Sequence, residues 1–354
     1  MLDVTDLRRY TDEPASTFDR RVNRAGPLNY LALSGGGAGG AYGAGVLNGW
    51  SAAGTRPEFS TVSGVSTGAL IAPFAFLGPA YDATLRDIYT SGIAGSLLDS
   101  PNILNVFFGS GLFGNTRLRE LIARYVDQDI LAAIAAAHAR GRRLFIVTTN
   151  LDTQRTVIWD MGRIASIGSS EALSLFRDVM AASASAPMIF PPMLIDAAAH
   201  GNRFQEMHVD GGVTAPVLTL PEAFLLRNAT LTRGPHTNIY ILINNKLERE
   251  FLLVPSSTVD IAVRASASAT KTLTRSILYE TYDFARRNNF GFNLTYVGRD
   301  TPLSSSSGFE TNEMRALYQY GYDKARAGEL WAKAPPADEL LPSGVRSRKS
   351  PTLH

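Results

Sequence analysis

Short apolar runs alternate with helix-like stretches along most of this chain. Runs at residues 28–34, 59–63 and 144–149 are rich in large aliphatic, aromatic and β-branched residues, as strands are. The first two are followed by segments in which apolar residues recur with helical spacing, and the third is preceded by one. Strands that alternate with helices predict a mainly parallel sheet covered on both faces. We therefore expect an α/β fold.

The same pattern predicts the remaining elements. Further strands are expected at residues 156–160, 204–210, 239–244 and 292–297. Helices are expected at residues 41–53, 116–126, 130–140, 170–182, 258–289 and 313–331. Pro73 lies in the apolar helical run after residue 66 and is expected to end or kink that helix, because proline lacks a backbone N–H.

Linker composition predicts the domain organisation. No Pro-, Gly- or Ser-rich linker divides residues 26–332, so we expect one domain there. Residues 1–25 form a polar N-terminal extension, and residues 333–354 form a Pro-rich polar tail that we expect to be disordered.

Composition narrows the classes of function. The 354 residues are 45% hydrophobic and 19% charged, as in a globular protein, and the net charge of +2 does not favour a nucleic-acid partner. There is no cysteine, and no two of the five histidines have the i, i+4 spacing of a helical metal site, so neither metal nor cofactor is expected. The polar N-terminus has no apolar stretch of the signal-peptide kind, and no uncharged apolar run in the chain is long enough to span a bilayer. We expect a cytoplasmic protein or one peripheral at a membrane, with export not excluded.

A first candidate for chemistry is the sequence GVSTG at residues 64–68. It has the form G-x-S-x-G, with a predicted strand before it and a helix after it. In a nucleophile elbow the serine occupies a tight, strained turn that only small neighbours allow, and Gly64 and Gly68 meet that need for Ser66. The alternative is a loop serine that caps the following helix.

The glycine run after the first strand fits two mechanisms. Gly35, Gly37 and Gly40 match the dinucleotide fingerprint G-x-G-x-x-G, which predicts an acidic residue at the end of the next strand. That strand instead ends at Ser66, and Glu58 precedes it. Alternatively, the backbone N–H groups of the loop bind a negative oxygen, such as the oxyanion of acyl transfer. A flexible glycine turn is the third interpretation.

A serine nucleophile needs a base. Glu206, His208 and Asp210 alternate along one predicted strand, and the other histidines lie in a helix, in polar loops or at the terminus. We favour Asp210, because it ends its strand and the following Gly211 and Gly212 let the chain turn. The alternative is an aspartate that only begins a turn.

Four motifs together resemble the patatin-like phospholipase family. They are LALSGGGAGGAYGAGVL at 31–47, GVSTG, ASASAPMIFPP at 182–192 and DGG at 210–212, in the family's order along residues 26–330. The resemblance implies a three-layer α/β/α fold and a Ser–Asp dyad without histidine. It makes Ser66 the nucleophile and Asp210 its base. The implied oxyanion hole and motif glycines are Gly35, Gly36, Gly37, Ala38 and Gly40, with Gly64, Gly68, Gly211 and Gly212. One departure is Gly39, where the family often has Arg or Lys.

The implied activity is that of a lipid acyl hydrolase, of phospholipase A or esterase type, which acts on lipid or phospholipid at a membrane surface without a cofactor. A transacylase that uses the same dyad and a dinucleotide-binding oxidoreductase are the alternatives. For membrane contact we consider residues 102–114, which include Phe107, Phe108 and Phe113. The alternative is that these phenylalanines lie in the core. The oligomeric state is not predicted.

Overall fold

The structure is a computed structural model that describes residues 2–18, 27–93, 115–199, 202–225, 236–299, 301 and 310–336. The strands are β1 (Arg8–Tyr10), β2 (Leu28–Leu33), β3 (Thr61–Val65), β4 (Arg143–Asn150), β5 (Arg155–Asp160), β6 (Met193–Ala199), β7 (Asn202–Asp210), β8 (Thr237–Ile243) and β9 (Gly291–Tyr296). The α-helices are α1 (Gly40–Ala52), α2 (Thr67–Leu77), α3 (Asp82–Thr90), α5 (Asn115–Tyr125), α6 (Gln128–Ala139), α7 (Met161–Ile167), α8 (Ser170–Ser183), α9 (Glu222–Leu225), α10 (Thr258–Asn288) and α11 (Thr311–Arg326). The 3₁₀ turns are η1 (Ala15–Thr17), η2 (Gly37–Gly39), η3 (Pro79–Tyr81) and η5 (Gly211–Val213).

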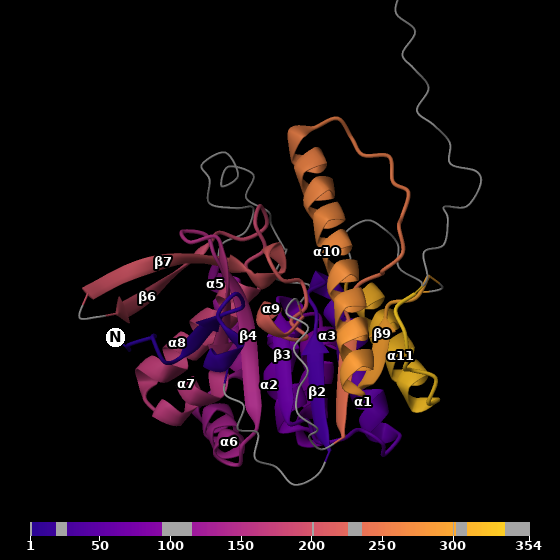
Figure 1. The fold of residues 1–354 in the computed structure, drawn as a ribbon. Helices are drawn as coiled ribbons and strands as arrows, with labels where there is room; N and C mark the ends of the chain where they lie inside the picture. Colours follow the sequence, from indigo (N-terminus) through magenta and orange to yellow (C-terminus); the bar gives the residue numbers. More distant parts are fainter. Residues whose placement is uncertain are drawn as a thin grey trace, which may run out of the picture.

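The strands form one mixed sheet in the order β1-β5-β4-β3-β2-β8-β9 (Figure 1). Strands β2, β3, β4, β8 and β9 run parallel, whereas β5 and β7 lie antiparallel to β4. Strand β6 extends the sheet only through β7, with which it forms a hairpin at one side of the molecule (Figure 1). The predicted, mainly parallel sheet is confirmed.

Helices cover both faces of the sheet, which makes the fold a three-layer α/β/α sandwich. Alternate side chains of β2 show the division: Leu31 and Leu33 pack into the larger core with helices α1, α2 and α8, and Ala32 packs into the smaller core with α10. The larger core also takes in side chains of α3, α5, α6, α7 and α11. The expected fold class is therefore confirmed.

Helix α1 contains glycines that weaken an isolated helix but allow close packing here. An added Cβ at Gly45 would lie 2.0 Å from the carbonyl oxygen of Tyr318, and one at Gly49 would lie 2.2 Å from that of Tyr322. Both tyrosines belong to α11. The two helix backbones approach so closely that only glycine fits between them. This contact fixes the helix that follows the glycine loop.

The register of three strands places the ends of β3 and β7 side by side. In the parallel β3–β4 pair, Val65 lies opposite Val147. On the same edge of β4, the next residue, Thr148, lies opposite Asp210 of β7. Strands β3 and β7 therefore end beside each other on β4, and the turn after Val65 faces the end of β7.

Some elements differ from the sequence prediction. Strands β1 and β6 were not predicted, and β1 pairs with β5 from within the polar extension. Helix α2 does not end at Pro73 but continues to Leu77. Almost all of α2 is buried, so its packing offsets the backbone hydrogen bond that Pro73 cannot make. The division into domains stays a prediction, and residues 102–114 lie outside the described residues.

Candidate active site

Ser66 occupies the sharp turn between β3 and α2. Its backbone has φ 55° and ψ −124°, a conformation that L-residues rarely adopt and that costs on the order of 1–3 kcal/mol. An added Cβ at Gly64 would lie 2.4 Å from the carbonyl oxygen of Gly68, and one at Gly68 would lie 2.5 Å from that of Leu33. The turn thus needs both glycines. The Ser66 side chain makes no capping hydrogen bond to α2, which argues against a simple helix cap.

Asp210 lies at the end of β7 with 6% of its surface exposed. Burial raises the pKa of its carboxyl group to about 6, although hydrogen bonding to the Ser66 hydroxyl and to the Gly212 N–H lowers it. The Gly212 N–H lies 2.7 Å from Oδ1 of Asp210. The strand register thus brings together a hydroxyl and a carboxyl group that ionises close to neutral pH. Such a pair can exchange a proton.

Close packing also explains the glycine after Asp210. An added Cβ at Gly211 would lie 2.5 Å from the carbonyl oxygen of Val147, so β4 leaves no room for a side chain there. The chain turns at Gly211 into η5, and the Asp210 carboxylate accepts the N–H of Gly212. Both motif glycines therefore hold Asp210 in place.

The glycine loop lies against Ser66. An added Cβ at Gly35 would lie 3.2 Å from the Cβ of Ser66. The Gly35 N–H already binds the carbonyl oxygen of Pro216, and the Gly40 N–H bonds within η2. The N–H groups of Gly36, Gly37 and Ala38 have no hydrogen-bond acceptor among the described residues. These three groups, next to the N-terminus of α1, are the donors that remain available to a bound anion.

The surroundings of Gly39 explain why this chain has glycine where the family often has Arg or Lys. An added Cβ there would lie 1.9 Å from the carbonyl oxygen of Asn244. The Asn244 side chain in turn donates to the Ser34 carbonyl at 2.8 Å, and its N–H donates to the Ser34 hydroxyl at the same distance. The segment after β8 is thus fastened to the start of the glycine loop, and it fills the space that a longer side chain at residue 39 needs.

Ser183 at the end of α8 is a site residue that the sequence analysis missed. Its hydroxyl accepts the Ser66 N–H at 3.0 Å and donates to the Val147 carbonyl at 2.6 Å. Two residues further, the Ser185 carbonyl accepts the Asp210 N–H at 3.0 Å. The sequence signal that could have identified Ser183 was the motif at residues 182–192, to which the sequence analysis assigned no role. This segment holds the backbones of both Ser66 and Asp210.

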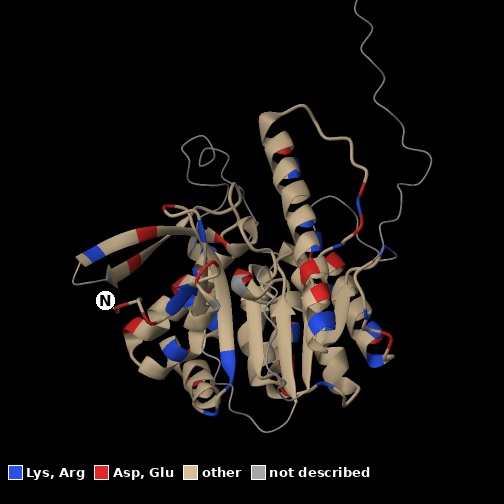
Figure 2. Ribbon diagram, viewed as in Figure 1, with Lys and Arg blue, Asp and Glu red and all other residues tan. Residues whose placement is uncertain are grey.

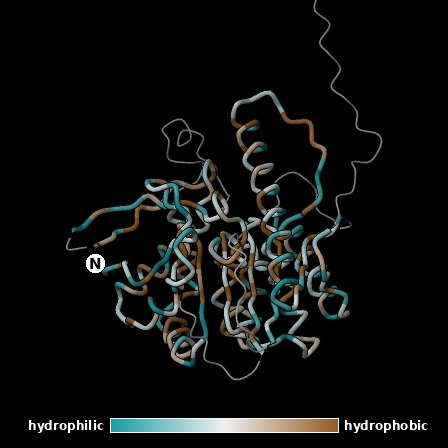
Figure 3. The backbone as a smooth tube through the Cα atoms, in the orientation of Figure 1, coloured by the Kyte–Doolittle hydropathy of each residue, from teal (hydrophilic) through white to brown (hydrophobic). Residues whose placement is uncertain are grey.

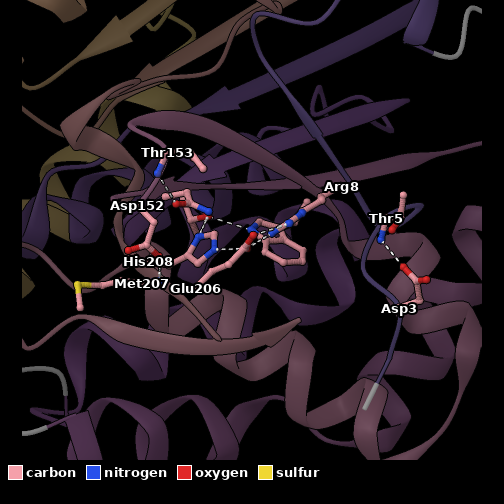
Figure 4. A network of polar contacts seen from close by, with 11 residues as sticks. Asp3, Thr5, Arg8, Asp152, Thr153, Glu206, Met207 and His208 are labelled. Atoms are coloured by element: carbon pink, nitrogen blue, oxygen red, sulfur yellow. Dashed lines mark hydrogen bonds and ion pairs between the residues drawn. The ribbon is translucent and has the colours of Figure 1, made fainter. Parts of the chain in front are cut away.

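His208 has both ring nitrogens occupied (Figure 4). Nδ1 lies 2.9 Å from the Thr148 hydroxyl, and Nε2 lies 3.1 Å from a carboxylate oxygen of Glu206. The ionised Glu206 carboxylate only accepts hydrogen bonds, so the neutral ring of His208 carries its proton on Nε2, and Nδ1 accepts from the Thr148 hydroxyl, which also accepts the Trp159 indole N–H. Burial lowers the pKa of His208. The imidazole has no free nitrogen for Ser66.

Glu206 continues this network to the N-terminal extension. Both of its oxygens accept hydrogen bonds from Arg8, one of them at 2.8 Å, so the pair is bidentate and nearly buried. Burial raises the pKa of Glu206, but the hydrogen bonds and charges of Arg8 and His208 lower it to about 2. These contacts couple β1 to β7 and make the first residues of the chain part of the fold (Figure 4).

Ser66 and Asp210 open onto a cavity of about 840 Å³. Its lining includes the apolar side chains of Leu70, Ile88 and Phe190. The size suits an elongated apolar ligand of small-molecule dimensions. Within the described ranges, no three His, Asp or Glu side chains gather in a group that could hold a metal ion.

The structure thus places a serine in a strained turn beside a buried aspartate, where strands β3 and β7 of an α/β/α sheet end. The patatin-like phospholipase profile matches residues 31–221, which is more than half of the chain and includes both residues and the glycine loop. The chain therefore belongs to the patatin-like phospholipase family, which supports lipid hydrolase activity.

The solved structures that match this chain include two proteins of low sequence identity. Alignment with VipD from Legionella pneumophila gives 12% identity and a TM-score of 0.35, and covers 85% of this chain and 67% of that one. Alignment with the type III effector protein ExoU gives 15% identity and a TM-score of 0.23, and covers 85% of this chain and 53% of that one. No curated protein matches the chain. No helix of the described part is long and apolar enough to cross a membrane.

Proposed function

We propose that this protein is a serine acyl hydrolase that cleaves fatty acyl esters of lipids, with Ser66 as nucleophile and Asp210 as its base. One observation carries the proposal: the strained Ser66 turn faces a carboxyl group whose burial raises its pKa to about 6. A base with a pKa near the working pH accepts a proton readily and returns it readily. The mainly apolar cavity beside the pair suits a fatty acyl chain.

The first step forms the acyl-enzyme. Asp210 takes the Ser66 proton while Oγ of Ser66 attacks the ester carbonyl carbon, and the carbonyl oxygen becomes an oxyanion. The N–H groups of Gly36, Gly37 and Ala38, which have no acceptor among the described residues, stabilise it in this proposal. When the intermediate collapses, the C–O bond to the alcohol breaks, and the proton on Asp210 passes to the leaving alkoxide. The acyl group stays on Ser66.

The second step releases the fatty acid. Asp210, again ionised, takes a proton from a water molecule whose oxygen attacks the acyl carbon. The same three N–H groups stabilise the second oxyanion. The bond to Oγ breaks, and the proton returns from Asp210 to Ser66. An alcohol in place of this water would give transacylation, and no feature of the described residues favours that acceptor over water.

The test measures hydrolysis of a short soluble ester and of a phospholipid in vesicles. Ser66→Ala and Asp210→Asn should each reduce kcat by about 10⁴-fold or more, and the double variant should be little worse, because the two groups act in one step. A fluorophosphonate probe should label the wild type but not Ser66→Ala. Ser174→Ala, which changes an exposed serine of α8, is the matched control and should keep full activity.

Two outcomes would contradict the proposal. If Asp210→Asn retains activity and His208→Ala abolishes it without unfolding the protein, the base is histidine. If the wild type hydrolyses neither ester and the probe labels no serine, the site does not perform acyl transfer. Competition by added alcohols would reveal transacylation, because acyl ester would then replace free fatty acid as the product.

A further inference from the structure

The most exposed apolar surface of the described protein lies on one projecting element. It comprises residues 245–257 and the N-terminal half of α10, residues 258–273, which together we call the α10 arm. All buried residues of α10 lie at or beyond Thr274. The first half of the helix therefore rests on no core, and at 1.5 Å per residue it projects by about 24 Å. Figure 1 shows it rising above the sheet together with the segment before it.

The tip of the arm is apolar on both of its parts. Phe251, Leu252 and Leu253 are between 53% and 61% exposed, and Val259, Ile261 and Val263 are between 47% and 53% exposed. Among residues 251–263 only Asp260 is charged. Figure 3 shows the hydrophobic colouring of the segment before α10 at the far end of the arm. Six large apolar side chains exposed together mark an interaction surface.

The base of the arm is held firmly. The Lys271 ammonium group donates to the Glu248 carbonyl at 2.6 Å and pairs with Glu250 at 3.4 Å, while Arg264 donates to the Glu250 carbonyl at 2.5 Å. These bonds tie residues 248–250 to α10. The apolar tip is thus presented by two segments that are fastened to each other below it.

The same base carries positive charge. Between residues 244 and 275 there are five basic and three acidic side chains, and the basic ones lie below the tip (Figure 2). Lys246 and Lys271 share Glu250. Arg249 is exposed and has neither an ion pair nor a hydrogen bond with a described residue. When the apolar tip lies in the hydrocarbon layer of a bilayer, the basic side chains at the base of the arm lie at the level of the headgroups and can contact anionic lipids.

The arm is continuous with the catalytic cavity. Lys246, Arg249, Val263 and Arg264 line the same cavity of about 840 Å³ as Ser66. A surface that binds at the arm therefore lies next to the cavity mouth. A molecule that leaves that surface can reach Ser66 along the walls of this cavity.

We propose that the α10 arm docks the protein on a lipid bilayer: its tip enters the boundary between headgroups and acyl chains, and Arg249 with its basic neighbours contacts anionic headgroups. This inference rests on the proposed function, in which a lipid substrate passes from the bilayer to Ser66. Amphipathic elements of this kind enter the bilayer by about 5–10 Å, which is less than the projection of the arm. The core of the domain stays outside the bilayer.

The test is flotation of the full-length protein with vesicles of phosphatidylcholine alone or mixed with phosphatidylglycerol. The double variant Leu252→Ser, Leu253→Ser should bind the mixed vesicles at least tenfold more weakly, because both side chains lose their place in hydrocarbon. The matched control is Ile167→Ser, Leu194→Ser, which removes two exposed apolar side chains from α7 and β6, outside the α10 arm. It should bind as the wild type does. Arg249→Glu should weaken binding by about fivefold or more to the mixed vesicles, with little change on phosphatidylcholine.

Further readouts separate docking from catalysis. The tip variant should keep its melting temperature and its activity on a soluble ester while losing activity on vesicles. Ser66→Ala should still bind vesicles, so an inactive wild type that binds them would contradict the proposed chemistry and leave the docking surface standing. Wild-type protein that does not bind, or a tip variant that binds fully, would overturn the docking proposal. So would a tip variant that loses stability, or one that only changes the protein from dimer to monomer.

Discussion

The hydroxyl of Ser183 accepts a hydrogen bond from the backbone N–H of Ser66 at 3.0 Å and donates one to the carbonyl of Val147 at 2.6 Å. The backbone of the Ser66 turn is thus held by a residue 117 positions further along the chain. Because Ser66 holds a strained conformation, such a support affects where its hydroxyl points. Ser183 is therefore a positioning residue.

Ser183→Ala should lower kcat by about tenfold or more and leave KM nearly unchanged. The Ser66 N–H then loses its buried acceptor, which costs about 1–3 kcal/mol and lets the strained turn relax. Steady-state kinetics on a soluble ester measure the effect. The matched control is Ser185→Ala, because among the described residues that buried hydroxyl bonds only the Ala181 carbonyl. Equal losses of kcat in the two variants would show that Ser183 has no special role.

Gly39→Ala should destabilise the protein by about 3 kcal/mol and abolish most activity. Its Cβ would meet the Asn244 carbonyl at 1.9 Å, so the glycine loop has to move away from Ser66. Gly54→Ala is the control, because no atom lies within 4 Å of an added Cβ there and the cost comes only from its positive φ, about 1 kcal/mol. Urea unfolding and ester hydrolysis test both. A stable, active Gly39→Ala protein would mean that the loop tolerates side chains.

The activity of the wild type should rise with pH through about 6. Burial raises the pKa of Asp210 to about 6, and only the ionised carboxylate can take the Ser66 proton. The logarithm of kcat/KM should therefore climb with unit slope below this pH and level off above it. The measurement is a pH profile on an uncharged soluble ester. A profile that is flat through pH 6 would contradict the role of Asp210 as base.

Asp210→Asn should stabilise the protein at pH values well above 6 while it removes activity. The pKa of Asp210 is raised from 3.8 to about 6, so its contribution to stability is fully present below 3.8 and is lost as pH rises through 6. The difference corresponds to on the order of 3 kcal/mol. Urea unfolding of both proteins on each side of this window tests the sign. A variant that is less stable than the wild type above pH 6 would contradict it.

Removal of Arg8 should destabilise the protein far more than removal of an exposed arginine. Arg8→Ala leaves Glu206 buried without its bidentate partner, and breaking such a pair costs about 3–5 kcal/mol. Arg155→Ala breaks the exposed pair with Asp12 and should cost less than about 1 kcal/mol. Urea unfolding at neutral pH compares the two. Similar losses would mean that Arg8 and Glu206 are effectively solvated.

Lowering the pH should remove the stability that Glu206 provides. Its pKa is lowered from 4.5 to about 2, so this contribution is present above 4.5 and is lost as pH falls towards 2. The difference in stability between the wild type and Arg8→Ala should therefore shrink across that window. A constant difference would assign the stability to packing of the Arg8 side chain instead.

The strained turn at Ser66 and the glycine loop before α1 were predictable from the sequence because both are local. A strand, two glycines around Ser66 and a helix lie within a few residues, and backbone sterics alone make that turn strained. The repeating pattern of apolar residues likewise determined the central strands and most helices, since burial of alternate faces depends on local spacing.

Only the tertiary structure decided how these pieces meet. Asp210 lies beside Ser66 because β7 pairs with the same edge of β4 as β3, beyond the point where β3 ends. Which strand pairs with which edge depends on contacts between residues that are far apart in the sequence. Strand β1 was missed because three polar residues carry no strand pattern, and it forms only where Arg8 finds Glu206. The N-terminal half of α10 looks like other helices in the sequence, yet the sheet ends before it and leaves its apolar side chains exposed. The physical reason is common to all three: residue spacing determines local conformation, whereas neighbours brought together by folding determine which surface is buried, paired or left open.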